Sequence, residues 1–291
     1  MSDNKEEIWI ESQVKFMYGK FYDLLINNKE VIRSNINTER EYIRYTVFID
    51  DIIPYLDNKK YIFDCDWRDS REIDEFVITH NRKYNSNSNP IFFLHHYNFP
   101  VWKLNLNDTI PFENKKSEII WRGSTSGRAA PDTNIRLNIV SKNYNLPNIN
   151  IGFTNGLQLY YTYKDKYDNF FKDKMSEYEQ FSYKYILCME GNDWATNFPW
   201  VLSSNSVPFH NYPFTWESWI FGNGLEPWVH FIPIKNDGSD LEEKLKWAMQ
   251  NNIECYKISE NGKEYMKNYS NKSITDKLFK RFLELYPIFK D

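Results

Sequence analysis

Hydrophobic positions recur at helical spacing near both ends of the chain. Over residues 11–27 an apolar side chain appears every third or fourth position, which predicts an amphipathic helix there; these side chains are Val14, Met17, Tyr18, Phe21, Leu24 and Leu25. Residues 273–286 carry the same pattern and are followed by Pro287. Because proline cannot continue a helix, we predict a last helix that ends at residue 286.

The first part of the chain carries short β-prone segments between polar stretches. Strands are expected at 45–49, 61–64 and 91–94, each bounded by turn-forming residues. Residues 85–89 read Asn-Ser-Asn-Ser-Asn before Pro90 and are expected to form an exposed loop. The polar segment 107–117 resembles a hinge, and we place a domain boundary at its end.

The second part alternates strand-like and helix-like patterns. Strands are expected at 118–121, 185–189 and 229–234. Helices are expected at 134–140, 195–202 and 241–249, the last opened by a capping box of Ser239 and Glu242. Strands that alternate with helices favour an α/β fold, in which helices cover both faces of a parallel sheet.

The size, composition and net charge of the chain exclude several classes of function. The chain has 291 residues with 41% hydrophobic and 26% charged, enough for one large or two medium domains. The net charge of −4 and the lack of a basic run argue against a nucleic-acid partner. No apolar stretch approaches the roughly 20 residues of a membrane span, and no signal peptide is evident. With three scattered cysteines and no CxxC pair, we expect reduced thiols in a cytoplasmic protein.

One loop has the composition of a phosphate site. The expected strand 118–121 runs into a segment with two glycines, three hydroxyls and two arginines, and Arg136 follows on the next helix. Glycines let the backbone approach a diphosphate, while hydroxyls, N–H groups and guanidinium forks donate to it. The candidate ligands are Arg122, Gly123, Ser124, Thr125, Arg128 and Arg136. The alternative interpretation is a solvated surface turn.

Two further segments can contact a nucleotide. At the end of the strand 185–189, Gly191 starts a turn, and Asp193 and Thr196 are good N-cap residues for the next helix, whose N-terminus would favour an anion. The alternative is an ordinary capped loop. Glu217 lies between two tryptophans and can accept hydrogen bonds from the vicinal hydroxyls of a ribose. The alternative is a partly exposed glutamate on a core helix.

Metal-binding and histidine patterns are sparse. Asp64-Cys-Asp66 matches a three-residue metal motif, but Asp66 or Asp69 can instead pair with Arg68. His95 and His96 are adjacent, so on a strand they point to opposite faces and at most one lines a given site. The other three histidines are expected to be structural; they are His80, His210 and His230.

The order of these motifs resembles that of a known family. Trp121-Arg-Gly-Ser-Thr-Ser-Gly127 with Asn134-Ile-Arg136 is similar to the signature of the CAP10-like glycosyltransferases, glycosyltransferase family 90. Similar segments follow in the same order, namely Tyr183 to Gly191, Asp193 to Asn197, Ser204 to Val207, Glu217 to Trp219 and Leu225 to His230. The resemblance covers about residues 118–250, and residues 1–117 match only loosely.

The resemblance implies a GT-B fold, in which two Rossmann-like lobes face each other across a cleft. The acceptor-side lobe would be residues 1–117, the donor lobe 118–272, and the helix 273–291 would pack back on the first lobe. It implies an inverting enzyme that transfers a sugar, xylose or glucose, from a UDP-sugar to a hydroxyl of a glycan, lipopolysaccharide or protein. No metal and no further cofactor would be required.

Particular residues carry over by position. Ser124 and Arg136 would contact the diphosphate, and Ile151 to Phe153 would border the uracil. The phosphates and the sugar would be enclosed by Trp194, Ala195, Thr196 and Asn197. The glucosyltransferase branch has Arg and Lys where this chain has Asn197 and Pro199, a departure that resembles the bacterial branch and leaves the phosphate ligands less defined.

The catalytic base is expected in the first lobe. An inverting transfer needs one base to take the proton of the acceptor hydroxyl. Asp69, just past the expected strand 61–64, is our first choice; His96 occupies the slot that the resemblance suggests, and Asp66 is third. The alternative function is a catalytically inactive sugar- or nucleotide-binding protein on the same scaffold.

Overall fold

The computed structural model describes residues 2–27, 76–91, 107–127 and 133–287, which divide into two compact units. The described residues of the first unit are 2–27, 76–91, 216–224 and 268–287, and those of the second are 107–127, 133–215 and 225–267. The predicted boundaries at 117/118 and 272/273 differ from this division. The chain passes between the units several times, so a single cut in the sequence cannot separate them.

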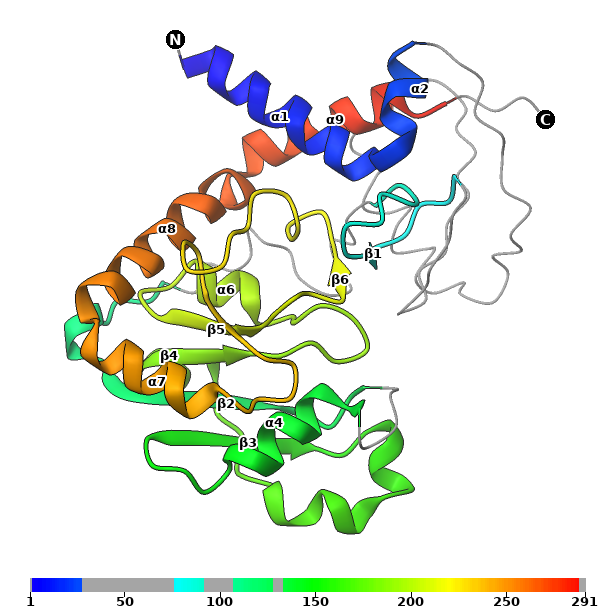
Figure 1. Cartoon of the computed structure of the whole chain (residues 1–291). Helices are drawn as coiled ribbons and strands as arrows, with labels where there is room; N and C mark the ends of the chain where they lie inside the picture. The colour runs from blue at the N-terminus through cyan, green and yellow to red at the C-terminus, as the bar shows by residue number, and fades with distance from the viewer. Residues whose placement is uncertain (1, 28–75, 92–106, 128–132, 288–291) are drawn as a thin grey trace. The chain divides into compact units, whose positions relative to one another are not determined.

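The second unit is built on a five-stranded sheet in which every pair of neighbours is parallel (Figure 1). In spatial order the strands are β3 (Ile149–Asn155), β2 (Lys116–Ser124), β4 (Tyr183–Cys188), β5 (Val207–Asn211) and β7 (Ile232–Ile234). The central strands β4 and β5 are buried along their whole length, as expected for a parallel sheet covered on both faces. The predicted α/β class with a parallel sheet is confirmed.

Helices cover both faces of this sheet. On one face, α4 (Ile135–Asn143), α7 (Leu241–Gln250) and the first part of α8 (Asn252–Ser270) share a hydrophobic core with the strands, and Phe209 of β5 points into it. The next residue, His210, points to the other face because side chains alternate along a strand. There its ring lies 4.5 Å from that of Phe198, the first residue of α6 (Phe198–Leu202).

In the first unit, helix α1 (Ser2–Tyr18) lies beside α9 (Lys272–Leu285) (Figure 1). The Tyr18 ring stacks on that of Phe282 at 4.1 Å between centroids, and its hydroxyl donates to the Phe282 carbonyl at 2.6 Å. The unit also contains α2 (Tyr22–Ile26) and the antiparallel pair β1 (Arg82–Lys83) and β6 (Trp216–Glu217).

Shorter helical elements fill the connections. The helix α5 spans Glu177–Gln180, and short 3₁₀ helices lie at Gly19–Phe21, Phe112–Asn114, Gln158–Tyr161, Lys164–Lys166 and Asp168–Phe170. A capping box of Ser176 and Glu179, which we did not predict, opens α5. The capping box predicted at Ser239 is absent, because Asp240 is the N-cap of α7 and its carboxylate accepts the N–H of Lys235 instead.

Several predicted boundaries are wrong for tertiary reasons. The first helix starts at Ser2 rather than at 11, and residues before 11 also pack within the first unit: Ile10 is buried, and the Trp9 ring lies edge-on at 5.1 Å from the ring of Tyr269. The last helix is 272–285, one residue earlier than predicted. The predicted strand 229–234 joins the sheet only from Ile232, because the chain before it turns through Trp228 at φ +66° and Phe231 bridges to Pro227 instead.

The asparagine-rich segment 85–89 is only partly the exposed loop we predicted. Asn85 and Asn87 are exposed and adopt positive φ angles of 60° and 50°, which asparagine tolerates better than most residues. Ser88 and Asn89 are buried, since the Asn89 amide donates to Thr79 Oγ1 at 2.7 Å. Of the three strands expected before residue 95, only Ile91 lies among the described residues, where it bridges to Thr79.

Candidate functional site

Two loops meet at the carboxyl edge of the sheet in the second unit. Strands β2 and β4 are parallel neighbours, so the loop 124–127 and the turn 190–193 leave the sheet at the same edge. Open α/β sheets bind ligands at this edge. The same two loops contain the hydroxyls and the glycine turn that the sequence predicted for a phosphate site.

Arg136 on α4 connects these loops. Its Nη1 donates to Ser126 Oγ at 2.6 Å and to the Ser124 carbonyl at 3.1 Å. The same nitrogen lies 3.2 Å from Ser124 Oγ. Its Nε donates to the Glu190 carbonyl at 3.2 Å and its Nη2 to that of Met189 at 3.0 Å. The structure therefore brings Ser124 and Arg136 together, as their predicted shared role requires.

The Arg136 guanidinium is enclosed by protein, although the residue keeps part of its surface accessible. This burial lowers the pKa of Arg136 to about 10, while the carboxylates of Asp193 and Glu190 act in the opposite direction. A guanidinium with this pKa still carries its full charge at neutral pH. The carboxyl edge of the sheet therefore carries a fixed positive charge. The carboxylates of Asp193 and Glu190 lie near enough to balance this charge in the free protein.

The loop 124–127 is held by side chains on both sides. The buried Thr125 donates its hydroxyl to the Leu157 carbonyl at 2.9 Å and accepts the Leu157 N–H at 2.8 Å. Asn134 caps α4 by accepting the N–H of Leu137 at 2.9 Å, and its amide donates to the Gly127 carbonyl at 3.2 Å. The Thr125 hydroxyl, predicted as a phosphate ligand, is thus used to fix the loop.

Two glycines allow close approaches at this edge. A Cβ on Gly191 would lie 2.8 Å from Ser126 Oγ and 2.9 Å from Arg136 Cζ, so only glycine lets the turn after β4 lie against the guanidinium. A Cβ on Gly123 would lie 2.3 Å from the Trp121 ring. Gly123 is therefore required by the packing of Trp121.

Arg122 points toward a different part of the unit. Its Nε donates to the Asp173 carbonyl at 2.9 Å, and its Nη atoms donate to the Asn150 carbonyl at 2.8 Å and to Asn150 Oδ1 at 3.0 Å. These contacts hold the guanidinium beside β3. Its predicted role at the diphosphate stays a prediction.

The segment 193–197 does not begin the helix we expected. Helix α6 starts at Phe198, and its N-cap is Asn197 rather than Asp193 or Thr196. The Asn197 amide donates instead to the Leu187 carbonyl at 2.8 Å, which ties the segment to β4. Trp194 and Ala195 are buried, so their side chains contribute mainly to packing.

The residues predicted to border a uracil base lie in the core. Ile151 and Phe153 are both fully buried in β3, and the Phe153 ring packs edge-on against Trp121 at 5.7 Å and Tyr167 at 5.6 Å. Their contact with a nucleobase stays a prediction.

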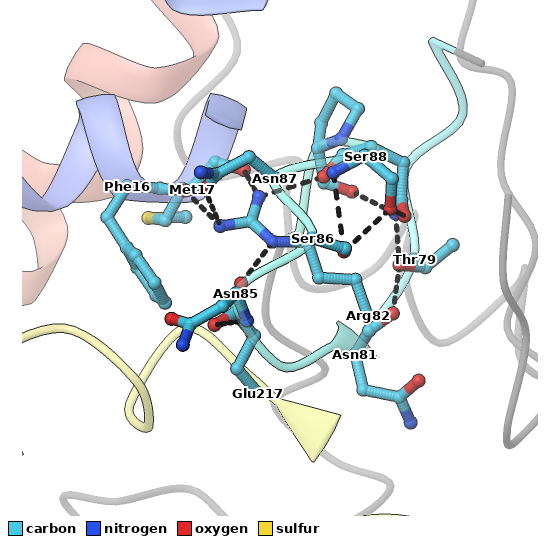
Figure 2. Close-up of polar contacts among 12 residues, drawn as sticks. Phe16, Met17, Thr79, Asn81, Arg82, Asn85, Ser86, Asn87, Ser88 and Glu217 are labelled. Carbon is cyan, nitrogen blue, oxygen red and sulfur yellow. Dashed lines mark hydrogen bonds and ion pairs between the residues drawn. The ribbon is translucent and has the colours of Figure 1, made fainter. Parts of the chain in front are cut away.

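Glu217 belongs to the first unit, where it forms a buried ion pair (Figure 2). Arg82 Nε donates to Glu217 Oε1 at 2.5 Å, and the Asn85 N–H donates to Oε2 at 3.1 Å. Other guanidinium nitrogens of Arg82 donate to the carbonyls of Asn89 and Phe16 at 2.9 and 2.7 Å. Glu217 is thus buried on the strand β6, so the alternative interpretation of a partly exposed residue on a core helix is wrong. Its role at a ribose stays a prediction.

Sequence reasoning gave no individual role to three residues of the carboxyl edge. Ser126 shares the hydroxyl-rich loop with Ser124 and could have been included on that ground. The buried carboxylate of Glu190 accepts from the Asn211 amide at 2.9 Å and from the Thr215 N–H at 2.8 Å. An acidic residue directly before the Gly191 turn was the available signal for Glu190. Nothing in the apolar pattern indicated Asn211.

Several predicted site residues lie outside the described residues: Asp66, Asp69, His96 and Arg128. The same holds for the Asp64-Cys-Asp66 motif. Within the part of the chain that the structure describes, no group of three or more His, Cys, Asp or Glu residues is arranged to hold a metal ion. No helix among the described residues is long and apolar enough to cross a membrane.

Residues 95–287 match the model of glycosyl transferase family 90, which is well over half of the chain. The chain belongs to this family. The family 90 resemblance drawn from the loop motifs is thereby confirmed, and the match covers every described residue of the second unit.

Similar curated proteins include sugar transferases from bacteria and animals. The chain is 29% identical over 163 residues to the O-glucosyltransferase LpsA of Dichelobacter nodosus, covering 56% of this chain and 47% of that protein. It is 35% identical over 115 residues to protein O-glucosyltransferase 2 of Danio rerio, covering 38% of this chain and 23% of that protein. The chain thus spans less than half the length of these two relatives.

Likeness to solved structures is weak. The C-terminal domain of a group 1 family glycosyl transferase (LpcC) from Francisella tularensis aligns with a TM-score of 0.35 and 13% identity, covering 59% of this chain and 92% of that one. Anabaena Alr3699/HepE in complex with UDP-glucose aligns with a TM-score of 0.45 and 8% identity, covering 72% and 64%.

Proposed function

We propose that this chain is a glycosyltransferase that moves a sugar from a UDP-sugar donor to a hydroxyl acceptor. The observation that carries the proposal is the convergence of Ser124, Ser126, Arg136 and the Gly191 turn at the carboxyl edge of a parallel sheet, in a member of family 90. Hydroxyl donors, a fixed cation and a closely approaching backbone are the groups that a diphosphate needs.

The same edge supports a role in leaving-group departure. In an inverting transfer, the acceptor oxygen forms a bond to the anomeric carbon while the bond from that carbon to the diphosphate oxygen breaks, and UDP leaves with the electron pair. The charge that develops on the diphosphate is stabilised by donors already fixed in place, because they need no rearrangement during the reaction. The Arg136 network, held by protein contacts on both loops, is such a fixed set.

The proton of the acceptor hydroxyl must pass to a base. We propose Asp69 for this role, ahead of His96 and Asp66, and we propose that it lies in the acceptor-side lobe of a GT-B enzyme. The second unit would then be the donor lobe. Metal independence and inversion of the anomeric centre belong to the same proposal.

Glucose and xylose are the proposed sugars, and the acceptor would be a hydroxyl of a glycan, lipopolysaccharide or protein. Support for glucose comes from the relatives named O-glucosyltransferases. A direct competition between UDP-glucose and UDP-xylose as donors will distinguish the two sugars.

The decisive experiment measures UDP release from UDP-glucose and from UDP-xylose without an acceptor, together with thermal unfolding. A donor at about 100 times its dissociation constant adds roughly 2.7 kcal/mol of stability, so binding will raise the unfolding midpoint. Binding with slow UDP release supports the enzyme. Binding without any release, even with added glycan acceptors, would instead support the inactive binding protein on the same scaffold, and no binding of either donor would contradict both.

A further inference from the structure

Two cationic side chains of the second unit converge on a single amide oxygen. Arg122 Nη2 and Lys172 Nζ each donate to Asn150 Oδ1 at 3.0 Å. The amide nitrogen of Asn150 donates to the Tyr183 hydroxyl at 3.3 Å, so the amide presents its oxygen to the two cations. The two positive charges are therefore neighbours, and we call Arg122, Lys172 and Asn150 the cationic cluster.

The cationic cluster lies away from the carboxyl edge of the sheet. Arg122 pairs with Gly152 in the register of β2 and β3, but its guanidinium reaches back to Asn150, the second residue of β3. Tyr183 is the first residue of β4. The contacts of the cluster thus run toward the amino ends of the strands, whereas the loop 124–127 follows the carboxyl end of β2.

The missing side chain of Gly152 lets Lys172 reach this position. A Cβ on Gly152 would lie 2.7 Å from Lys172 Cγ and 2.9 Å from Lys172 Cδ, so the lysine stem lies directly against β3. The Lys172 N–H donates to the Phe153 carbonyl at 2.8 Å, which fixes its backbone beside the strand. The ammonium also lies 4.6 Å from the centroid of the Tyr144 ring, a cation–π distance. Fixed groups therefore place this charge.

The two charges lack an acidic ion-pair partner among the described residues. Asp173 contacts Arg122 through its backbone carbonyl, so its carboxylate acts on the guanidinium only at longer range. Burial lowers the pKa of both cations, and the charge of Arg122 lowers the pKa of Lys172 further. Like charges that are partly buried disfavour each other, and an anion bound between them would relieve that repulsion.

Both cations keep N–H groups for a ligand. A guanidinium has five N–H donors and an ammonium has three. In the described part of the chain, four hydrogen bonds leave Arg122, to the carbonyls of Asp173, Trp121 and Asn150 and to Asn150 Oδ1. One Nη2 hydrogen of Arg122 remains, and Lys172 makes one such bond. The remaining hydrogens lie on the two nitrogens that share Asn150 Oδ1, and both side chains keep part of their surface accessible.

We propose that the cationic cluster is a second anion site, in which Arg122 and Lys172 together bind an oxyanion of the phosphate class. The site is additional to the proposed nucleotide-sugar site and does not depend on it. A guanidinium and an ammonium side by side match the several acceptor oxygens of one phosphate group. Two sources carry this chemistry: inorganic phosphate, and a phosphate substituent on a sugar of the acceptor.

The test is thermal unfolding of the full chain titrated with sodium phosphate in saturating UDP. UDP occupies the proposed donor site, and sodium chloride at matched ionic strength accounts for screening. Phosphate is expected to raise the unfolding midpoint of the parent. Lys172→Met keeps an unbranched stem without the charge, and it should weaken phosphate binding at least about tenfold, the usual effect of losing a hydrogen bond to a charged group.

The matched control is Lys174→Met, which makes the same change of charge at an exposed position two residues away and should leave phosphate affinity at the parent value. Gly152→Ala tests the geometry, because it keeps both charges while its Cβ displaces the Lys172 stem. The midpoint shift caused by phosphate is expected to shrink in Gly152→Ala. Should Lys172→Met fail to fold, Gly152→Ala decides, and an undiminished phosphate response in that variant would overturn the inference.

Glucose 6-phosphate and glucose, used as further probes, distinguish the two sources. A response to glucose 6-phosphate at lower concentration than to phosphate, with none to glucose, would assign the site to a phosphate carried on a sugar. Equal responses to both phosphates would assign it to the free ion. Either result supports the site only where the response is lost in Lys172→Met.

The remaining outcomes count against the inference. A parent whose midpoint responds to phosphate no more than to chloride has no such site, and a parental response in Lys172→Met removes that residue from it. Equal losses in Lys172→Met and Lys174→Met would show diffuse attraction and would also overturn the inference. A parent that does not bind UDP contradicts the proposed function alone, because the same variants titrated with phosphate in the absence of UDP still decide on the cationic cluster.

Discussion

Arg136 shows how one side chain can organise a site. It lies on α4 and joins the end of β2 to the end of β4 through carbonyls and hydroxyls of both loops. Burial lowers its pKa only to about 10, so it remains charged across the physiological range. Its removal would leave the carbonyls of Ser124, Met189 and Glu190 without these donors and would remove the cation from the edge.

Arg136→Ala is therefore expected to weaken UDP binding by about 1.5–3 kcal/mol, because the two loops lose the side chain that joins them and the edge loses its fixed positive charge. Calorimetric titration with UDP measures this change. Lys142→Ala on the same helix is the control, since its ion pair with Asp237 is exposed and should not affect the site. A folded Arg136→Ala variant that binds UDP like the parent would remove Arg136 from the site.

The proposed base can be tested with one pair of variants. Asp69→Asn is expected to bind UDP normally and to transfer sugar about 10²–10⁴-fold more slowly, because a general base acts on the acceptor and not on the donor. Transfer to an acceptor, measured beside UDP affinity, separates these two effects. Near-parental transfer by Asp69→Asn, accompanied by slow transfer in His96→Gln, would assign the role to His96.

His210 gives the fold a dependence on pH. Its ring is fully enclosed, near the rings of Phe198 and Phe214, and this burial lowers the pKa of His210 to about 4. The unfolded chain will take up a proton near the ordinary pKa of 6.5, while the folded chain stays neutral there. The free energy of unfolding is then unaffected above pH 6.5 and falls as the pH is lowered toward 4.

We expect this single group to lower the free energy of unfolding by up to about 1.4 kcal/mol for each pH unit in that window. Urea unfolding of the parent and of His210→Phe at pH 5 and pH 7 measures it. The variant has no ionisable ring at this position, so its stability should depend less on pH than that of the parent. Identical pH dependence in both proteins would show that His210 is not neutral when folded.

At the scale of elements, the site depends on how each strand ends and on the loop or turn that comes after it. The turn after β4 lies against the guanidinium because Gly191 has no side chain, and the loop after β2 is closed by the Asn134 cap of α4 and by Thr125. Loop and turn are therefore set by neighbouring elements, and the hydroxyls they carry are placed as a consequence.

Gly191→Ala is expected to reduce UDP affinity by at least tenfold (about 1.4 kcal/mol), because its Cβ would force Ser126 or Arg136 to shift. Gly238→Ala is the matched control: Gly238 has φ +68°, and its added Cβ would lie 2.9 Å from Ile139, away from the guanidinium. Both variants will lower the unfolding midpoint, but the increase in midpoint caused by UDP should shrink only in Gly191→Ala. An equal response to UDP in both variants would contradict the close approach.

At the scale of the whole molecule, the chain assembles each unit from separated segments. The first unit takes residues 216–224 and 268–287 from the second half of the sequence, and the second unit takes the rest of the described residues after 106. The buried Arg82–Glu217 pair joins positions 135 residues apart within the first unit (Figure 2). Stability of the first unit thus depends on segments that no local pattern connects.

We predict that transfer needs no divalent metal ion. The positive charge of Arg136 and the surrounding donors would take the part that a metal plays elsewhere in stabilising a leaving diphosphate. UDP release in the presence of EDTA, compared with added manganese or magnesium, tests this. Loss of activity in chelator that returns with either metal would contradict both the prediction and the proposed GT-B architecture.

The sequence by itself determined the local features of this protein. Alternating strand and helix patterns correctly indicated a parallel α/β sheet, the helices near 135–143 and 241–250, and the hydroxyl-rich loop with Arg136 on the following helix. These features depend on residues close in sequence: hydrophobic spacing, a loop rich in glycine and hydroxyls, and a cation in the first turn of α4. Strands β3 and β5 escaped prediction because Asn, Gly, Pro and His interrupt their apolar pattern.

Only the tertiary structure decided how the side chains are used. Arg122 and Arg136 look equivalent in the sequence, yet one is bound to Asn150 and the other joins the two loops. Thr125 fixes a loop, and Glu217 is paired with Arg82. Each of these contacts needs a partner that only the packing of distant segments brings near. The free energy that holds those segments together comes from the whole fold and not from the local sequence. The local sequence of a residue fixes its chemistry, while the assembled fold fixes the atoms on which that chemistry acts.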